Sequence, residues 1–268
     1  MSRRSDVSTD HAPPAVNGAL ILSLGLSFDP FVRSFRSIGA GTIRRVARRG
    51  DLNGWWLLGI AVVGFFWRIA FRPRVEGAGR VPSTGPAIVA ANHVSALDGV
   101  VLALTTSSRS RRMTRFLVAA EFFRRIRFGW ALRLYRQIPI RRGERDQGAL
   151  DVAIETIRDG ALAGIFPEGT VNPEPETGMS RGRRGVARIA LATGAPVVPV
   201  GIWGTQDRWP KSGLHIRRPW RPVVAVSYGG PISPKGAADS PEDVLAFTDL
   251  IMAAIAEQTE RARKLAEA

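Results

Sequence analysis

Residues 87–98 read AIVAANHVSALD, and this stretch decides how the whole chain is interpreted. Ala87–Ala91 is a short apolar run that follows a Gly-Pro pair, a pattern typical of a buried strand. A polar loop comes next, and we expect a helix to start at Ser95 and to run to about Thr106. Because open α/β sheets carry their sites where strands end, His93 is expected at a functional position.

His93 and Asp98 fall around the first turn of that expected helix. A carboxylate placed there can hold one imidazole nitrogen and leave the other free to act as a base near neutral pH. The same residues also form a capping box, in which Ser95 caps the helix and Asp98 is its third residue. Taken alone, the pattern fits catalysis and capping equally well.

Strands and helices alternate through the rest of the chain. Strands are expected at Phe116–Ala119, Ile138–Ile140, Ala161–Phe166, Val197–Ile202 and Val223–Tyr228, with another opening near Val75. Helices are expected from near Asp146 to Gly160, over Arg184–Thr193, and after Ser240. Pro139 favours an edge position for its strand. The alternation predicts one α/β domain over residues 72–268, with a central mixed sheet flanked by helices and a C-terminal helix.

A second motif, Phe166-Pro167-Glu168-Gly169-Thr170, also follows an expected strand directly. The proline ends the strand, and Gly169 lets the backbone come close to a ligand. The Glu168 carboxylate can accept hydrogen bonds from hydroxyl groups. By itself the motif is better explained as an ordinary strand-to-loop turn.

In this order, the two motifs resemble those of the glycerolipid acyltransferases, in particular the 1-acylglycerol-3-phosphate (lysophosphatidic acid) acyltransferases. That family carries Asn-His-x4-Asp, a strand ending in arginine, Phe-Pro-Glu-Gly-Thr-Arg and a Val-Pro-rich strand. The matching segments here are Asn92–Asp98, Ile138–Arg142, Phe166–Thr170 and Val197–Val200. The resemblance covers roughly residues 72–232.

The resemblance implies transfer of a fatty acyl group from coenzyme A or acyl carrier protein to the hydroxyl of a lysoglycerolipid. His93 would be the general base, and Asp98 would orient its ring. The implied acceptor-binding residues are Arg142, Glu168, Gly169 and Thr170. No metal and no prosthetic group is implied, because the acyl thioester is a co-substrate.

Two positions depart from the family pattern, both on the side of the acceptor's phosphate. Val171 stands where the family has an arginine, and Ala120 stands where a basic residue is common. Arg184, or its neighbours Arg181 and Arg183, would fill the gap from the following loop. The alternative is a different lysolipid acceptor.

Composition excludes several other classes of protein. The 268 residues contain no cysteine and three histidines, which rules out a thiol nucleophile and makes a zinc site improbable. The formal net charge of +15 raises nucleic-acid binding as a rival function. However, no zinc-finger or RNP-like motif is present, so we expect no nucleic-acid partner. A non-catalytic membrane-bound relative is a third hypothesis, and the retained His93 and Asp98 argue against it.

The N-terminal part predicts membrane contact. Residues 1–50 are expected to be a flexible basic region, and residues 51–71 a membrane-associating helical segment. Trp55–Phe71 reads WWLLGIAVVGFFWRIAF, which is too short to span a bilayer comfortably and has arginines on both sides. Such flanks suit a helix that lies on anionic lipid, so we expect peripheral or monotopic attachment to the cytoplasmic face of the cell membrane. The alternative is a buried core helix.

Overall fold

In the computed structural model, residues 54–268 are described, apart from 125, 141–146 and 216–218. Seven strands form one sheet in the order β1-β7-β6-β2-β5-β3-β4. Their bounds are β1 Arg72–Glu76, β2 Ala87–Ala91, β3 Thr114–Ala119, β4 Ile138–Ile140, β5 Leu162–Ile165, β6 Val197–Trp203 and β7 Val223–Tyr228. The five strands from β6 to β4 are parallel, whereas β7 pairs antiparallel with β6, and β1 runs parallel to β7. The predicted mixed sheet is therefore confirmed, and β4 lies at its edge, as Pro139 predicted.

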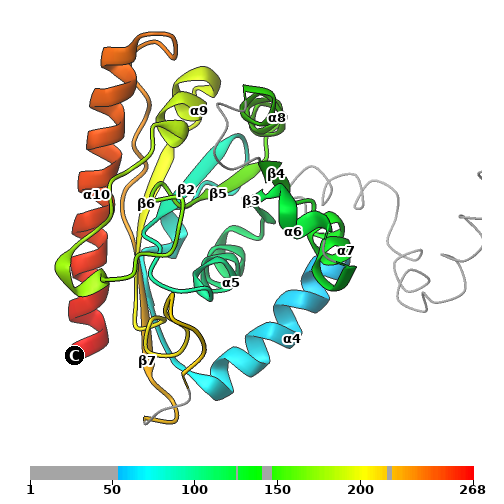
Figure 1. Cartoon of the computed structure of the whole chain (residues 1–268), viewed down its shortest axis with the longest axis vertical. Helices are drawn as coiled ribbons and strands as arrows, with labels where there is room; N and C mark the ends of the chain where they lie inside the picture. Colours follow the sequence, from blue (N-terminus) through cyan, green and yellow to red (C-terminus); the bar gives the residue numbers. More distant parts are fainter. Residues whose placement is uncertain (1–53, 125, 141–146, 216–218) are drawn as a thin grey trace, which may run out of the picture. The chain divides into compact units, whose positions relative to one another are not determined.

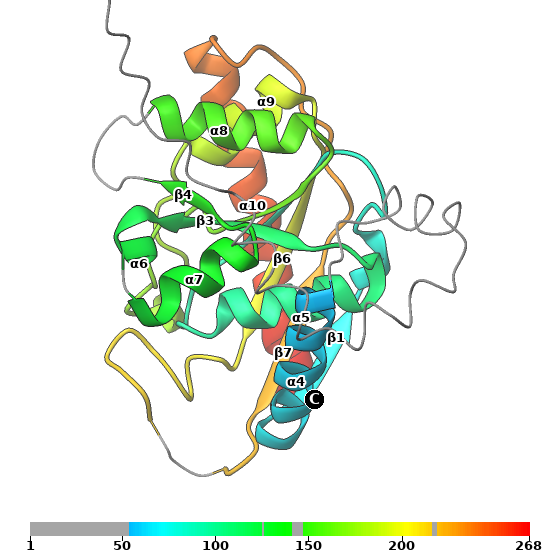
Figure 2. The same cartoon turned by 90° about the vertical axis from the view of Figure 1, so that its right-hand side faces the viewer.

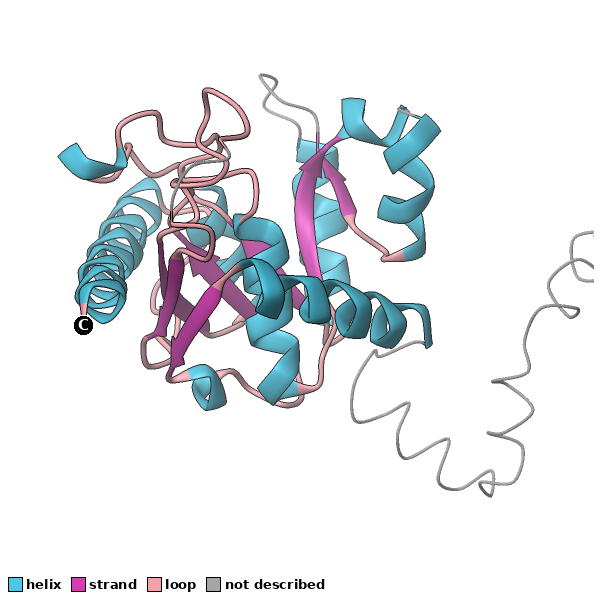
Figure 3. Cartoon of the chain, turned by 90° about the horizontal axis from the view of Figure 1, so that it is seen from below, coloured by secondary structure: helices cyan, strands magenta, loops and turns pink. Residues whose placement is uncertain are grey.

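Helices cover both faces of this sheet (Figures 1 and 2). They are α4 Gly54–Ala70, α5 Asp98–Ser110, α6 Ala120–Arg124, α7 Ile126–Leu134, α8 Gln147–Arg158, α9 Gly185–Thr193 and α10 Pro241–Glu267. Two 3₁₀ turns, η1 Ala78–Arg80 and η2 Pro175–Thr177, lie in loops. Helices α8, α9 and α10 pack on one face, and α4 and α5 pack on the other. Figure 3 shows α10, which ends at the C-terminus, lying alongside the strands.

The centre of the sheet is fully enclosed because apolar helix faces press on it from both sides. All five residues of β2 are buried, as are all seven residues of β6. Such continuous apolar runs are expected where a parallel sheet is covered on both faces. The outcome is a rigid platform whose strand ends hold the polar loops described below.

Both bounds of the helix after β2 were predicted wrongly. Helix α5 begins at Asp98, three residues after the expected start at Ser95, and it continues to Ser110 instead of ending near Thr106. The residues between strand and helix form a loop because the Asp98 carboxylate accepts the backbone N–H groups of Val94 and Ser95. Helices α6 and α7 were not predicted at all.

The two later caps confirm their predictions. Ser240 caps α10, since its hydroxyl accepts the N–H of Asp243. Gly194 ends α9 in the left-handed conformation at φ 69°, which a residue without a Cβ adopts at no steric cost. These signals are local, so the sequence around each cap is enough to fix it.

Helix α4 packs on the domain with only part of its surface. Trp56 and Trp67 are buried, and the Trp56 indole donates a hydrogen bond to the Ser107 hydroxyl of α5 at 3.2 Å. Most of the remaining apolar side chains are exposed: Trp55, Leu57, Leu58, Val62, Val63, Phe65, Phe66 and Ile69. Among the described residues, no helix combines the length and the hydropathy needed to cross a membrane. The expected basic region 1–50 lies outside the described residues.

Candidate active site

The candidate site lies where three neighbouring parallel strands end. Strand β2 is flanked by β5 and β6, and the register pairs Ala90 with Ile165 on one side and Ala91 with Val200 on the other. The three loops that leave these ends carry His93, Glu168 and Thr205. Parallel pairing thus brings together residues that are far apart in the sequence, as expected for a site at the carboxyl edge of an open sheet.

His93 and Asp98 form a hydrogen-bonded pair, with 2.9 Å between Nδ1 and Oδ2. The same Oδ2 also accepts the N–H groups of Val94 and Ser95 at 2.7 Å each. An ionised carboxylate only accepts hydrogen bonds, so it favours the tautomer in which Nδ1 of His93 carries the proton. The other ring nitrogen, Nε2, then keeps a free lone pair.

The pair combines a buried carboxylate with an accessible imidazole. The Asp98 side chain is 0% exposed, whereas the His93 side chain is 19% exposed. A buried charge is costly unless donors surround it, and here backbone amides supply them. The predicted capping box is wrong, because Leu97 and not Ser95 is the N-cap of α5, and no side chain caps the helix there. One oxygen of Asp98 nevertheless binds both the loop amides and the imidazole.

Thr205 completes the surroundings of the carboxylate, and it was not predicted from the sequence. Its hydroxyl donates to Oδ1 of Asp98 at 2.6 Å, and both residues are fully buried. The signal that could have identified Thr205 is its place just after β6, which matches the place of His93 just after β2. The carbonyl of Trp209 also accepts hydrogen bonds from the Ser95 hydroxyl and the Ala96 amide, which ties the two loops together.

An aromatic stack fixes the plane of the imidazole. The ring of Phe166 lies 4.3 Å from the His93 ring, centroid to centroid, with an interplanar angle of 18°. Phe116 of β3 stacks behind Phe166 at 5.9 Å and 9°. The hydrogen bond to Asp98 and this stack together leave His93 little rotational freedom.

Glu168 is buried and binds backbone amides on two sides. Its Oε1 accepts the N–H of His93 at 2.7 Å, and its Oε2 accepts the N–H of Ser180 at 2.9 Å. In addition, the backbone N–H of Asn172 donates to the His93 carbonyl at 2.7 Å. The loop after β5 therefore clamps the backbone of the histidine. That Glu168 accepts hydrogen bonds from an acceptor's hydroxyls stays a prediction.

Asn92 joins the histidine loop to the neighbouring strand. Its side-chain amide donates to the Ile202 carbonyl at 2.9 Å, and its Oδ1 accepts the Ile202 N–H at 2.7 Å. This two-point bond replaces a strand pairing after β2 has ended. Asn92 thereby fixes the residue before His93 against β6.

The other predicted substrate-binding residues lie in different surroundings. Gly169 sits at φ 71° in the turn after Glu168, and Thr170 follows it in the same loop. Arg184 caps α9 and lines a hollow against α10. Arg142 lies outside the described residues. No group of three histidine, aspartate or glutamate side chains suited to a metal ion occurs in the part of the chain that the structure describes.

One ionisable group near the site has a shifted pKa. Burial raises the pKa of Asp207, and the negative charge of Glu176 raises it further, while Arg208 acts in the opposite direction. Asp207 lies two residues after Thr205, in the loop that reaches Trp209. Its carboxyl therefore holds its proton to a higher pH than an ordinary aspartate.

Comparisons with known proteins point to the family that the sequence motifs resemble. Residues 72–203 match the family model described as Acyltransferase. The chain is 27% identical over 179 residues to the 1-acyl-sn-glycerol-3-phosphate acyltransferase of Borreliella burgdorferi. This alignment covers 64% of each protein. It is 31% identical over 145 residues to the protein of that name from Pseudomonas aeruginosa, covering 53% of each. The matches thus span between half and two thirds of these relatives.

A solved structure gives a similar result over a larger part of the chain. The 1-acyl-sn-glycerophosphate (LPA) acyltransferase PlsC from Thermotoga maritima aligns with a TM-score of 0.57 and 26% sequence identity. The alignment covers 77% of this chain and 79% of that one. The likeness therefore extends to the α/β fold over about three quarters of the chain.

Proposed function

Because the chain belongs to the acyltransferase family, we propose that it transfers a fatty acyl group from a thioester to the hydroxyl of a lysoglycerolipid. The proposed acceptor is 1-acylglycerol-3-phosphate and the product is phosphatidic acid. The observation that carries the proposal is the pair of His93 and Asp98, in which a buried carboxylate holds an accessible imidazole. The names of the relatives support the choice of acceptor.

In the proposed mechanism His93 is the general base. Its Nε2 takes the proton of the acceptor hydroxyl while that oxygen attacks the thioester carbonyl carbon. Asp98 holds the ring and stabilises the imidazolium that forms, as the aspartate of a serine hydrolase does. When the carbon–sulfur bond breaks, the proton passes from the imidazolium to the departing thiolate. The bond formed is an ester, and no acyl-enzyme is required.

The acyl donor in this proposal is acyl-CoA or acyl carrier protein. Either one supplies the thioester, so the reaction requires neither a metal nor a prosthetic group. Glu168, Gly169 and Thr170 line the loop next to His93 and are the proposed contacts for the acceptor's glycerol backbone. Arg142 and Arg184 remain candidates for its anionic group.

We further propose that the enzyme works on the cytoplasmic face of the cell membrane, as a peripheral or monotopic protein. The support is α4, whose outer surface exposes Phe65 and Phe66 at 62% each. Burying apolar surface contributes about 25 cal/mol per Å², so an exposed face of this kind favours a lipid environment. The acceptor is itself a membrane lipid, and surface attachment would bring the site to it.

The test is a reaction of purified full-length protein in detergent with a panel of lysolipids, run once with acyl-CoA and once with acylated acyl carrier protein as the donor. We expect a product with the mass of phosphatidic acid from 1-acylglycerol-3-phosphate. Faster acylation of a lysolipid with another headgroup would contradict the proposed acceptor while retaining the acyl transfer. Absence of product with every acceptor and with both kinds of donor would contradict the proposal as a whole.

A further inference from the structure

The loop that joins β6 to β7 carries large apolar side chains on its surface. This β6–β7 loop comprises residues 204–222, of which all but 216–218 are described, and Figure 2 shows it extending beyond the ends of both strands. Trp220 is 69% exposed, and Trp209 and Leu214 are exposed as well. Large apolar side chains in water forgo the free energy of burial, so three of them in one loop indicate a surface that meets a partner.

The end of the β6–β7 loop is fixed to the last turn of α4. The Arg221 guanidinium donates to the carbonyl of Arg68 at 2.7 Å and to the carbonyl of Phe71 at 3.3 Å. An arginine suits this position because the last carbonyls of a helix have no partner within the helix. Trp220 precedes Arg221 directly, so its backbone lies beside the C-terminal end of α4.

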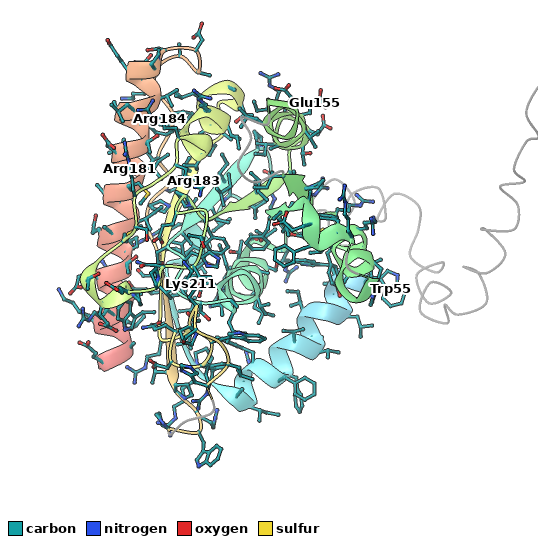
Figure 4. The ribbon with its side chains drawn as sticks, viewed as in Figure 1. Trp55, Glu155, Arg181, Arg183, Arg184 and Lys211 are labelled. Carbon is teal, nitrogen blue, oxygen red and sulfur yellow. The ribbon has the colours of Figure 1, made fainter. Side chains whose placement is uncertain are left out.

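The other end of α4 also carries an exposed tryptophan. Trp55 is the second residue of the helix, and Figure 4 shows it pointing away from the domain. Between the two ends lies the row of exposed apolar side chains that includes Phe65 and Phe66. An apolar surface with an indole at each end is typical of residues that face a bilayer, because indole rings prefer the level of the lipid headgroups.

The charges around these side chains favour an anionic partner. The described residues of the β6–β7 loop include three basic side chains and one acidic side chain: Arg208, Lys211, Arg221 and Asp207. Lys211 is exposed, and so is Arg68 on the adjoining turn of α4. Exposed tryptophan combined with a surplus of positive charge is complementary to a surface of anionic lipid headgroups.

We propose that the β6–β7 loop is a second lipid-contacting element, which places Trp220 in the headgroup layer of an anionic bilayer beside the end of α4. The inference rests on the membrane attachment proposed above. It deepens that proposal by naming a contact surface that lies more than 130 residues beyond α4 in the sequence and belongs to the acyltransferase domain itself. The bilayer is the partner because the loop joins the apolar row of α4 through Arg221.

The base of the same loop is bonded to the candidate active site. The Thr205 hydroxyl donates to Oδ1 of Asp98 at 2.6 Å, and the carbonyl of Trp209 accepts the N–H of Ala96 at 3.2 Å. One loop therefore connects the buried carboxylate of the site with the exposed indole of Trp220. Lipid contact at Trp220 would hold the His93 loop close to the bilayer that contains the acceptor.

The absence of cysteine from the chain makes a direct test possible. Trp220→Cys introduces a single thiol, which is labelled with the environment-sensitive fluorophore NBD. The labelled protein is mixed with vesicles of phosphatidylcholine and phosphatidylglycerol. We expect the emission to shift to shorter wavelength and to gain intensity, because the label leaves water for the headgroup region. Leu250→Cys, on the exposed side of α10 across the sheet from α4, is the matched control, and its emission should not change.

Three results of this experiment would overturn the inference. If the protein floats with the vesicles while the label at residue 220 stays in water, α4 makes the contact without the loop. If the labels at residues 220 and 250 shift equally, the fluorophore itself adsorbs to lipid. If the emission at residue 220 shifts with rising protein concentration and no vesicles, the loop binds a second copy of the chain instead of a bilayer.

The second test measures how much the loop contributes to binding. Trp220→Ser should weaken flotation with the same vesicles about tenfold, whereas Trp220→Phe, which keeps an aromatic ring, should retain most of the binding. Both variants should fold, because the side chain is mostly exposed, and Tm checks this. Equal binding by the wild type and Trp220→Ser would contradict the proposed contact.

Both tests contain no acyl donor and no lysolipid, so they do not depend on the proposed reaction. If the wild type does not float with vesicles, the proposed membrane attachment fails and this inference fails with it. If the label at residue 220 enters lipid and no lysolipid is acylated in the enzyme assay, the proposed reaction fails and the lipid contact stands.

Discussion

The loop around His93 and the helix α4 differ in where their side chains find partners. In the loop, the Asp98 carboxylate receives hydrogen bonds from two backbone amides, one imidazole and one hydroxyl, all from within the domain. In α4, only Trp56 and Trp67 are buried, and a row of large apolar side chains faces outward. The loop is thus complete without a partner, whereas α4 has apolar surface that the described part of the chain does not cover.

This difference separates the features expected to serve catalysis from those expected to attach the protein to a membrane. A charged group buried with four donors is held in one orientation, as a catalytic carboxylate must be. An exposed apolar helix face gains free energy by contacting lipid, and its exact side chains matter less than their total area. Substitutions should therefore act sharply in the loop and gradually in α4.

The largest effect is expected for His93→Ala. Removing a positioned general base typically lowers the rate 10²- to 10⁴-fold, and the fold should persist because the ring is partly exposed. The measurement is kcat with acyl-CoA and 1-acylglycerol-3-phosphate, with Tm as a check on folding. His215→Ala, at the other histidine among the described residues, should retain full activity. Comparable rates for the two variants would refute the mechanism.

The second effect concerns α4 and its predicted lipid contact. The double substitution of Phe65→Glu and Phe66→Glu places two charges on its outer face, where both side chains are 62% exposed. We expect binding to anionic vesicles to weaken at least about tenfold, since each buried Phe contributes roughly 1.5 to 3 kcal/mol. Flotation of the protein with vesicles measures this.

The matched control for α4 is Leu250→Glu, because Leu250 of α10 is 52% exposed on the opposite face of the domain. It should leave vesicle binding unchanged. If both changes reduce flotation equally, the contact depends on net charge and α4 is not the lipid-binding face. Detergent assays of the α4 variant should give normal kcat, which would separate placement from chemistry.

Much of both regions could be predicted from the sequence, because their signals are local. The buried run of β2, the Ser240 cap and the apolar stretch of α4 each need only a few neighbouring residues. Thr205 could not be found in this way, since it reaches Asp98 across 107 positions through the pairing of β6 with β2. Likewise, the start of α5 depends on which backbone N–H groups the Asp98 carboxylate binds. Helix propensities of single residues do not contain this information.

The third effect tests the part of the loop that the sequence did not reveal. Thr205→Val keeps the shape of the side chain and removes the donor to Oδ1 of the buried Asp98. We expect kcat to fall about tenfold with little change in KM, because the carboxylate holds the imidazolium less well. Thr205→Ser should restore the rate, since it returns the hydroxyl. An unchanged kcat in a folded Thr205→Val protein would mean that the loop amides alone orient Asp98.

The smallest effect concerns α5, which connects the two regions: it begins at Asp98 and packs against α4. Its C-terminal half is held by Tyr228 of β7, whose hydroxyl lies 2.6 Å from the Thr105 hydroxyl and 2.9 Å from that of Thr106. Burial raises the pKa of Tyr228 to about 12, against the lowering effect of these two hydrogen bonds. An unfolded tyrosine titrates near about pH 10.

The sign of the effect follows from proton binding. Between about pH 10 and pH 12 the folded protein keeps the Tyr228 proton and the unfolded chain loses it, so stability falls by about 1.4 kcal/mol per pH unit. Tyr228→Phe should cost about 1 kcal/mol at neutral pH through its lost hydrogen bonds, yet lose less stability over that alkaline window. Urea unfolding at pH 8 and pH 11 measures both differences. If the variant and the wild type lose stability equally on going to pH 11, the anchor of α5 does not depend on a neutral Tyr228.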